Sequence, residues 1–240
     1  MLDMEFVKYL SSLKITDNVL FVKEKEKLKT WTIDGAGVLS CLGEYRGEEA
    51  SLLPDVFSMD ASKLQEIVNF AKKDMSFEFD HGTLIVEGKD KKISYQLQKS
   101  KRTDIPTMKL DYGKPLFRIE SSSMQEILKA RTIVKSLSVT INADKDSVDF
   151  IIRGVVPGNK ILLKFDKLRD DIEETQSFPN NLFEVLSMCN GDAFDVYMGV
   201  SEKPAPLRMT FADETSKLDY YVAQRIEDKT EDAKEEPKEE

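Results

Sequence analysis

The chain has 240 residues, enough for one large domain or two small ones; 40 % of them are hydrophobic and 33 % are charged. Lysine and arginine number 35 against 44 acids, which excludes a uniformly basic protein that wraps nucleic acid but not a local basic patch. No apolar run reaches the roughly 18 residues of a membrane span, and the first residues lack the pattern of a secretion signal. We therefore expect a cytoplasmic protein with no membrane partner.

Few side chains suit catalysis or metal binding. The two cysteines, Cys41 and Cys189, are too few for a disulfide framework, and both lie in apolar surroundings typical of core residues. His81 is the only histidine, and its place between two alternating runs, after Asp80 and before a glycine, is typical of a hairpin turn. The segment Gly35–Gly37 lacks the third glycine of a nucleotide-binding loop and also fits a turn. We expect no enzymatic activity, no cofactor and no metal site.

Four segments have the spacing of amphipathic helices. The first is the opening segment, Phe6–Leu13. The second, Met59–Val68, has a similar copy sixty residues later in Ile119–Leu128, and a weaker copy, Phe178–Leu186, follows about 58 residues after that. Side chains suited to capping a helix N-terminus stand near the start of these three repeated segments: Asp60, Glu120 or Ser121, and Asn180.

Between the helical segments, apolar and polar residues alternate as in half-buried strands. The strands expected are Met75–Phe79, Thr83–Glu87 and Ile93–Leu97, then Leu137–Ile141, Val148–Ile152 and Ile161–Phe165. We therefore expect an α+β fold in which one unit, a helix plus several antiparallel strands, occurs four times. Two units would share a core, which gives two similar domains.

The expected domains are residues 1–98 and 117–228, joined by a linker at 99–116. The linker has two prolines, several charges and no sustained periodicity. It is longer than compact packing requires, which favours a docking surface over a passive tether. The chain from Glu227 to Glu240 holds eight acids and three lysines, so we expect residues 229–240 to form a disordered acidic tail.

This organisation resembles the DNA sliding clamps, specifically the trimeric kind represented by proliferating cell nuclear antigen and the clamps of tailed bacteriophages. The most specific match is Leu218–Asp228, which is similar to the Tyr-Tyr-Leu-Ala-Pro-Lys-Ile-Glu-Asp ending of the nuclear-antigen family, with Gln224 where that family usually has proline. Pro206–Phe211 resembles the family's closing strand, and Gly158–Leu163 is similar to its subunit-contact strand. A short strand pair around Trp31–Leu39 is closer to the phage clamps, which favours a viral or archaeal-type clamp.

The resemblance implies a function without chemistry. A homotrimeric ring would encircle double-stranded DNA in a sequence-independent way and tether DNA polymerase and other replication proteins. An ATP-driven clamp loader would place the ring on DNA, in the host cytoplasm if the protein is viral. The alternative is a monomeric clamp-fold subunit that binds DNA through one open basic face.

Three sets of residues would carry this function. Cations on the free helix faces would line the ring, although lysines at helix ends also complement the helix dipole. The lumen candidates are Lys8, Lys72, Lys73, Lys129, Arg131 and Lys135. Edge strands at 91–98 and 159–165 would close the ring. The interface candidates are Ile93, Tyr95, Leu97, Asn159, Ile161 and Leu163.

The third set is a shallow apolar pocket between the linker and the C-terminal strand, suited to a short partner peptide with one or two hydrophobic anchors. The alternative is that the apolar linker residues only hold the linker to the sheet. The pocket candidates are Ile105, Pro106, Met108, Leu110, Tyr221, Val222, Ala223 and Gln224.

Overall fold

The computed structural model describes residues 4–13, 18–70, 75–100, 102, 104–188, 193–199 and 204–225. The expectations for Lys72, Lys73, Cys189 and the acidic tail at 229–240 lie outside these residues.

The first half of the chain contains helices and strands in an order that the second half repeats. Its elements are α1 (Met4–Ser11), β1 (Asn18–Glu24), β2 (Lys27–Ile33), β3 (Leu39–Tyr45), α2 (Glu49–Leu52), β4 (Val56–Asp60), α3 (Ala61–Phe70), β5 (Ser76–Asp80), β6 (Thr83–Gly88) and β7 (Lys91–Gln96).

The second half begins with a short strand and then follows the same order without a counterpart of the short helix α2: helix, three strands, one strand, helix and three strands. Its elements are β8 (Phe117–Ile119), α4 (Ser121–Val134), β9 (Ser136–Ala143), β10 (Ser147–Gly154), β11 (Lys160–Asp166), β12 (Thr175–Pro179), α5 (Leu182–Met188), β13 (Phe194–Tyr197), β14 (Leu207–Ala212) and β15 (Ser216–Val222). The α+β fold with four helix-and-strand units is therefore confirmed.

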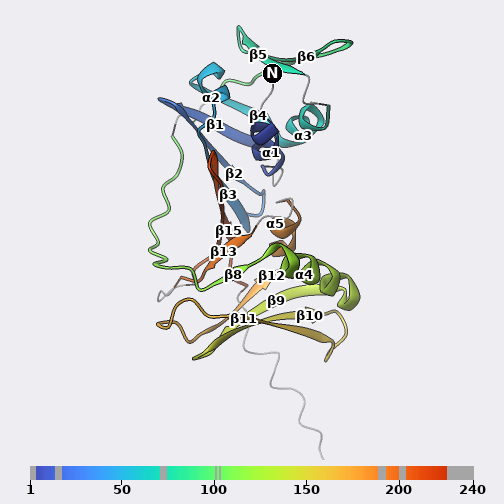
Figure 1. The fold of residues 1–240 in the computed structure, drawn as a ribbon, viewed down its shortest axis with the longest axis vertical. Coiled ribbons are helices and arrows are strands. Elements are labelled where there is room, and N and C mark those ends of the chain that lie inside the picture. The colour runs from blue at the N-terminus through green and yellow to red at the C-terminus, as the bar shows by residue number, and fades with distance from the viewer. Residues whose placement is uncertain are drawn as a thin grey trace, which may run out of the picture.

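The strands of the described residues form three antiparallel sheets. The largest has eight strands in the order β4-β1-β2-β3-β15-β14-β13-β8 and includes strands from both halves, which meet where β3 pairs with β15. A four-stranded sheet (β11-β10-β9-β12) and a three-stranded sheet (β5-β6-β7) complete the set. Helices α1, α3, α4 and α5 lie on one side of the eight-stranded sheet, and the segment from β7 to β8 runs along its other side (Figure 1).

Helix α1 is held against the sheet by buried aromatic residues. Tyr9 is 1 % exposed, and its hydroxyl lies 2.7 Å from the Thr30 hydroxyl on β2. Gly43 on β3 passes so close to both residues that an added Cβ would lie 2.3 Å from the Thr30 hydroxyl oxygen. The close approach explains why this position in a strand lacks a side chain.

The helix ends follow the capping pattern only in part. Asp60 accepts hydrogen bonds from the backbone N–H groups of Ser62 (2.8 Å) and Lys63 (3.2 Å), so it caps α3 as its sequence position indicates. Glu120 stands at the N-cap of α4 but makes no capping hydrogen bond with its side chain. At the other end of α4, Lys135 adopts a left-handed conformation with φ 50° and ends the helix.

None of the helices among the described residues has the length and apolar character needed to span a bilayer. His81 lies in the β5–β6 turn with φ 45° and its side chain is 97 % exposed, which confirms the hairpin interpretation. Cys41 is buried on β3, as expected for a core residue.

Candidate functional site

A hollow of about 500 Å³ lies between the linker and the outer face of the eight-stranded sheet. Ile105, Pro106 and Met108 line it from the linker, while Leu42 and Tyr221 line it from β3 and β15. We call this hollow the linker pocket. The structure thus brings the linker and the C-terminal strand together, as the sequence analysis expects.

Half of the expected pocket residues lie elsewhere. Val222 is fully buried and stands opposite Leu39 on the helix-covered face, because neighbouring residues of a strand point to opposite faces. Ala223 continues the ladder by donating its backbone N–H to the Val38 carbonyl, 2.7 Å away. Val222, Ala223, Gln224 and Leu110 are not among the residues that line the linker pocket.

The linker pocket is also more charged than expected. Apart from its apolar lining, it is bordered by both acids and bases: Glu24, Lys29, Glu44, Asp104, Lys217 and Asp219. On the outer face of β15 the residues alternate as lysine, aspartate and tyrosine at 217, 219 and 221. A peptide in this pocket would contact apolar and charged groups together.

The linker is fixed at both ends of the pocket by contacts that sequence reasoning did not find. At its start, the Arg102 guanidinium lies over the Trp31 ring, 4.2 Å from the centroid, which is a cation–π contact. At its end, the Tyr112 hydroxyl donates to the Pro206 carbonyl at 2.9 Å, and Arg169 donates to the Tyr112 carbonyl. The described linker residues between these anchors contain no helix or strand. They cross the pocket as a strap.

A network of charges and rings supports the end of this strap. Asp219 accepts from Arg208 at 3.0 Å and from the Thr210 hydroxyl at 2.6 Å. The Arg208 guanidinium also lies 4.7 Å from the centroid of the Tyr197 ring. Burial, with the nearby charge of Asp219, raises the pKa of Tyr221 to about 12. The pocket floor is therefore tightly held beside β15.

The lumen candidates divide into two kinds. Lys8 lies over the Phe211 ring at 5.3 Å, and Arg131 lies over the Phe183 ring at 5.1 Å, so both pack against aromatic residues. Lys129 and Lys135 are exposed on α4 and at its end. Over their described lengths, α1, α3, α4 and α5 together carry four bases and four acids. The basic surface expected there thus depends on Lys135 and on lysines outside the described residues.

The interface candidates lie on strands at the edges of sheets. Ile93 and Tyr95 on β7 are half-buried, and Leu97 just after β7 is buried. Gln98, however, exchanges two backbone hydrogen bonds with Ser58 on β4, so this edge is free only over β7 and not to residue 98.

The other candidate edge is β11, the outer strand of the four-stranded sheet. Ile161 and Leu163 are half-buried on it, and Asn159 is exposed just before it. Within the described part of the chain, no cluster of histidine, cysteine or acidic residues could hold a metal ion.

Comparison with known proteins gives matches by structure alone. No family model matches the chain, and no curated protein matches it by sequence. The proliferating cellular nuclear antigen of Entamoeba histolytica is 16 % identical, with a TM-score of 0.70 over 92 % of this chain and 95 % of that one. The A. fulgidus PCNA, solved with the C-terminal region of FEN-1, is 17 % identical, with a TM-score of 0.73 over 93 % and 96 %.

A chain from the PCNA2–PCNA3 complex of Sulfolobus tokodaii is 12 % identical, with a TM-score of 0.72 over 92 % of this chain and 95 % of that one. These matches cover nearly the whole length of both chains in each comparison. The chain therefore has the fold of the sliding clamps of the PCNA type.

Proposed function

We propose that the chain is the subunit of a homotrimeric sliding clamp that encircles duplex DNA and tethers DNA polymerase and other replication proteins. The observation that carries this proposal is the way the two halves of one chain join. Strand β3 of the first half pairs with β15 of the second, and their counterparts in the repeat, β11 and β7, remain free at the sheet edges of the described structure. Free edges of this kind pair with other chains.

The repeat also supports one register for the proposed contact between subunits. Ser58 bridges to Gln98 in the first half, and the Arg225 N–H donates to the Ser177 carbonyl in the second, so the two bridges are equivalent. From Ser58, the pairing through β1 and β2 leads to Leu42 on β3. From Ser177, the pairing through β9 and β10 leads to Leu162 on β11, the equivalent of Leu42.

The same counting makes Ile161 the equivalent of Cys41. Ile93 lies five residues before Gln98, and Tyr220 lies five residues before Arg225, so Ile93 is the equivalent of Tyr220. Since Cys41 stands opposite Tyr220 within the chain, Ile161 of one subunit is expected opposite Ile93 of the next. The S. tokodaii structure is a complex of two PCNA chains, which supports association of such subunits.

The DNA would lie against the helices. The four longer helices of the described structure lie on one side of the sheet (Figure 1). Lys129 on α4 and Lys135 at its end are exposed. Contacts to phosphates alone would position the duplex without reading its sequence and would allow sliding. Lys72 and Lys73 remain candidates for the same surface. A monomeric subunit with one open DNA-binding face is the alternative.

The partners would dock on the opposite side, in the linker pocket. The A. fulgidus PCNA binds the C-terminal region of FEN-1, which supports capture of a partner's end by this fold. We assign polymerase and clamp-loader tails to this pocket, a non-enzymatic role to the chain, and a cytoplasmic location. The division into domains at 1–98 and 117–228, with an acidic tail, belongs to the same proposal.

A topological assay tests the ring without a loader. A variant with Ile93→Cys and Ile161→Cys is assembled by oxidation in the presence of a circular plasmid or of the same plasmid linearised, then washed at high salt. We expect retention on circular DNA only, and loss on adding reductant, because a closed ring leaves a linear duplex by its ends. Equal retention on both DNA forms would contradict the ring.

A further inference from the structure

A second hollow, of about 1020 Å³, opens beside the linker pocket at the β1–β2 hairpin. We call it the hairpin hollow. It is lined by charged residues alone: Glu24, Lys25, Glu26, Lys27, Lys29, Glu44 and Arg46. Three of these, Glu24, Lys29 and Glu44, also line the linker pocket, so the two hollows are continuous. A peptide that fills the linker pocket can extend directly into the hairpin hollow.

The charges of the hairpin hollow leave cations available. Glu44 accepts from Lys27 at 3.0 Å and from Arg46 at 2.6 Å through the same oxygen, Oε1. Burial acts to raise the pKa of Glu44, but the hydrogen bonds from these two cations outweigh it and the pKa lies below its ordinary value. One ionised carboxylate thus pairs with two cations. Lys29 is neutralised separately by Glu24 at 2.6 Å.

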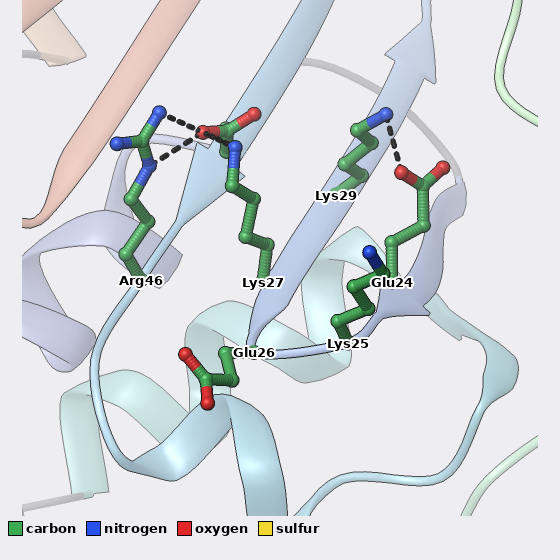
Figure 2. A pocket seen from close by; sticks show the side chains of 7 residues that line it. Glu24, Lys25, Glu26, Lys27, Lys29 and Arg46 are labelled. Carbon is green, nitrogen blue, oxygen red and sulfur yellow. Dashed lines mark hydrogen bonds and ion pairs between the residues drawn. The ribbon is translucent and has the colours of Figure 1, made fainter.

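Lys25 adds a further cation. It occupies the hairpin turn with φ 58°, a left-handed conformation that glycine adopts more easily, and its ammonium has no acidic partner in the described part of the chain. Figure 2 shows Lys25 beside Glu24 and Lys29, whereas Glu26 points away from this group. With all seven lining residues counted, the hairpin hollow has four bases and three acids, on a chain whose net charge is −9.

We propose that the hairpin hollow binds acidic residues of the same partner segment whose apolar anchor occupies the linker pocket. The inference rests on the proposed function, because it takes the linker pocket as the anchor site. Lys25, Lys27 and Arg46 would pair with aspartate, glutamate or a terminal carboxylate of the partner, as lysine and arginine do in charge-assisted contacts. This contact makes the hairpin a specificity element of the clamp.

The strand register sets the spacing within that segment. Tyr221 stands opposite Ser40, and Lys217 opposite Glu44, so Glu44 lies four residues along and one strand across from Tyr221. With about 3.3 Å per residue and about 4.8 Å between strands, the separation is roughly 14 Å. Lys27, at the end of β2 beside the hairpin turn, is six residues along and two strands across from Tyr221, which gives roughly 22 Å. An extended segment spans this with about four to six residues between its apolar anchor and its acids.

Selection from a phage-displayed library of random peptides, each about 14 residues long, tests the proposal on the full-length chain. We expect the peptides selected by the wild-type protein to carry an apolar anchor with acids about four to six residues away. In calorimetric titrations, Lys25→Gln and Lys27→Gln should each weaken binding of these peptides by up to about fivefold, less at high salt. Lys89→Gln, at the exposed β6–β7 turn, is the matched control and should change nothing.

The outcomes separate the two proposals. Peptides that bind the Lys25→Gln and Lys27→Gln variants as tightly as the wild type, but lose binding with Met108→Asp, would overturn the hairpin hollow and leave the linker pocket standing. Peptides that bind the Met108→Asp variant unchanged, or a library that yields no binder, would overturn both.

Discussion

Cysteines at positions 93 and 161 are expected to join neighbouring subunits by a disulfide. In the proposed ring, Ile93 of one subunit would stand directly opposite Ile161 of the next. Directly opposed residues of an antiparallel pair have Cα atoms about 4.5 to 5.5 Å apart, within the range of about 4.4 to 6.8 Å that a disulfide accepts. A register slip of two residues would move one Cα by about 6.6 Å and increase the separation to roughly 8 Å, beyond the reach of the bond.

The assay is mild oxidation followed by a denaturing gel without reductant. We expect species that contain two and three linked chains, and their disappearance on reduction. The control pairs Ile93→Cys with Leu162→Cys, because a shift of one residue turns the side chain to the other face. Cross-linking of this control, or none with Ile161→Cys, would refute the register and the repeat argument behind it.

Three further predictions concern the pocket, the DNA surface and the effect of pH. Met108→Asp should abolish binding of partner peptides with little change in Tm. Val222→Asp should lower the free energy of unfolding, measured with urea, by about 4 kcal/mol or more, because it buries a carboxylate in the core. Equal stability of the two variants would contradict the assigned faces of β15. Lys129→Glu with Lys135→Glu should weaken DNA binding and reduce the log–log salt slope by about 1 to 2, and an unchanged slope would remove α4 from the DNA surface. Tyr221 has a pKa raised from 10.0 to about 12, so the folded state favours the neutral phenol, and the stability that this gives is lost as the pH rises through this range. In a plot of Tm against pH, Tyr221→Phe should therefore fall less steeply than the wild type. Parallel curves for the two proteins would contradict the burial of this hydroxyl.

The helices and strands could be predicted because their periodicity is strong. The segment Leu64–Val68 and its later copy place apolar residues on one helix face, and both segments are helical in the structure. On strand β15, periodicity does not predict which side chains are buried. Tyr220, Tyr221 and Val222 are all apolar, so the alternation does not show which of them point into the core. The sequence analysis placed Val222 beside the linker, whereas the structure buries it fully.

The anchors of the linker could not be predicted for a different reason. Arg102 meets Trp31, and Arg169 meets the backbone of Tyr112, across 71 and 57 residues of sequence, and no local pattern marks such partners. The packing of Lys8 could not be predicted for the same reason, since the aromatic ring that it covers belongs to a strand from the other half of the chain. Local periodicity therefore gives the elements, whereas tertiary contacts decide which charged groups remain free.

The mass of the protein in solution tests the ring most directly. Size-exclusion chromatography with light scattering, at micromolar concentration and near-physiological salt, should give three times the 27.4 kDa of one chain. A single species with the mass of one chain under these conditions would contradict the closed ring and favour a monomeric subunit with one open DNA-binding face.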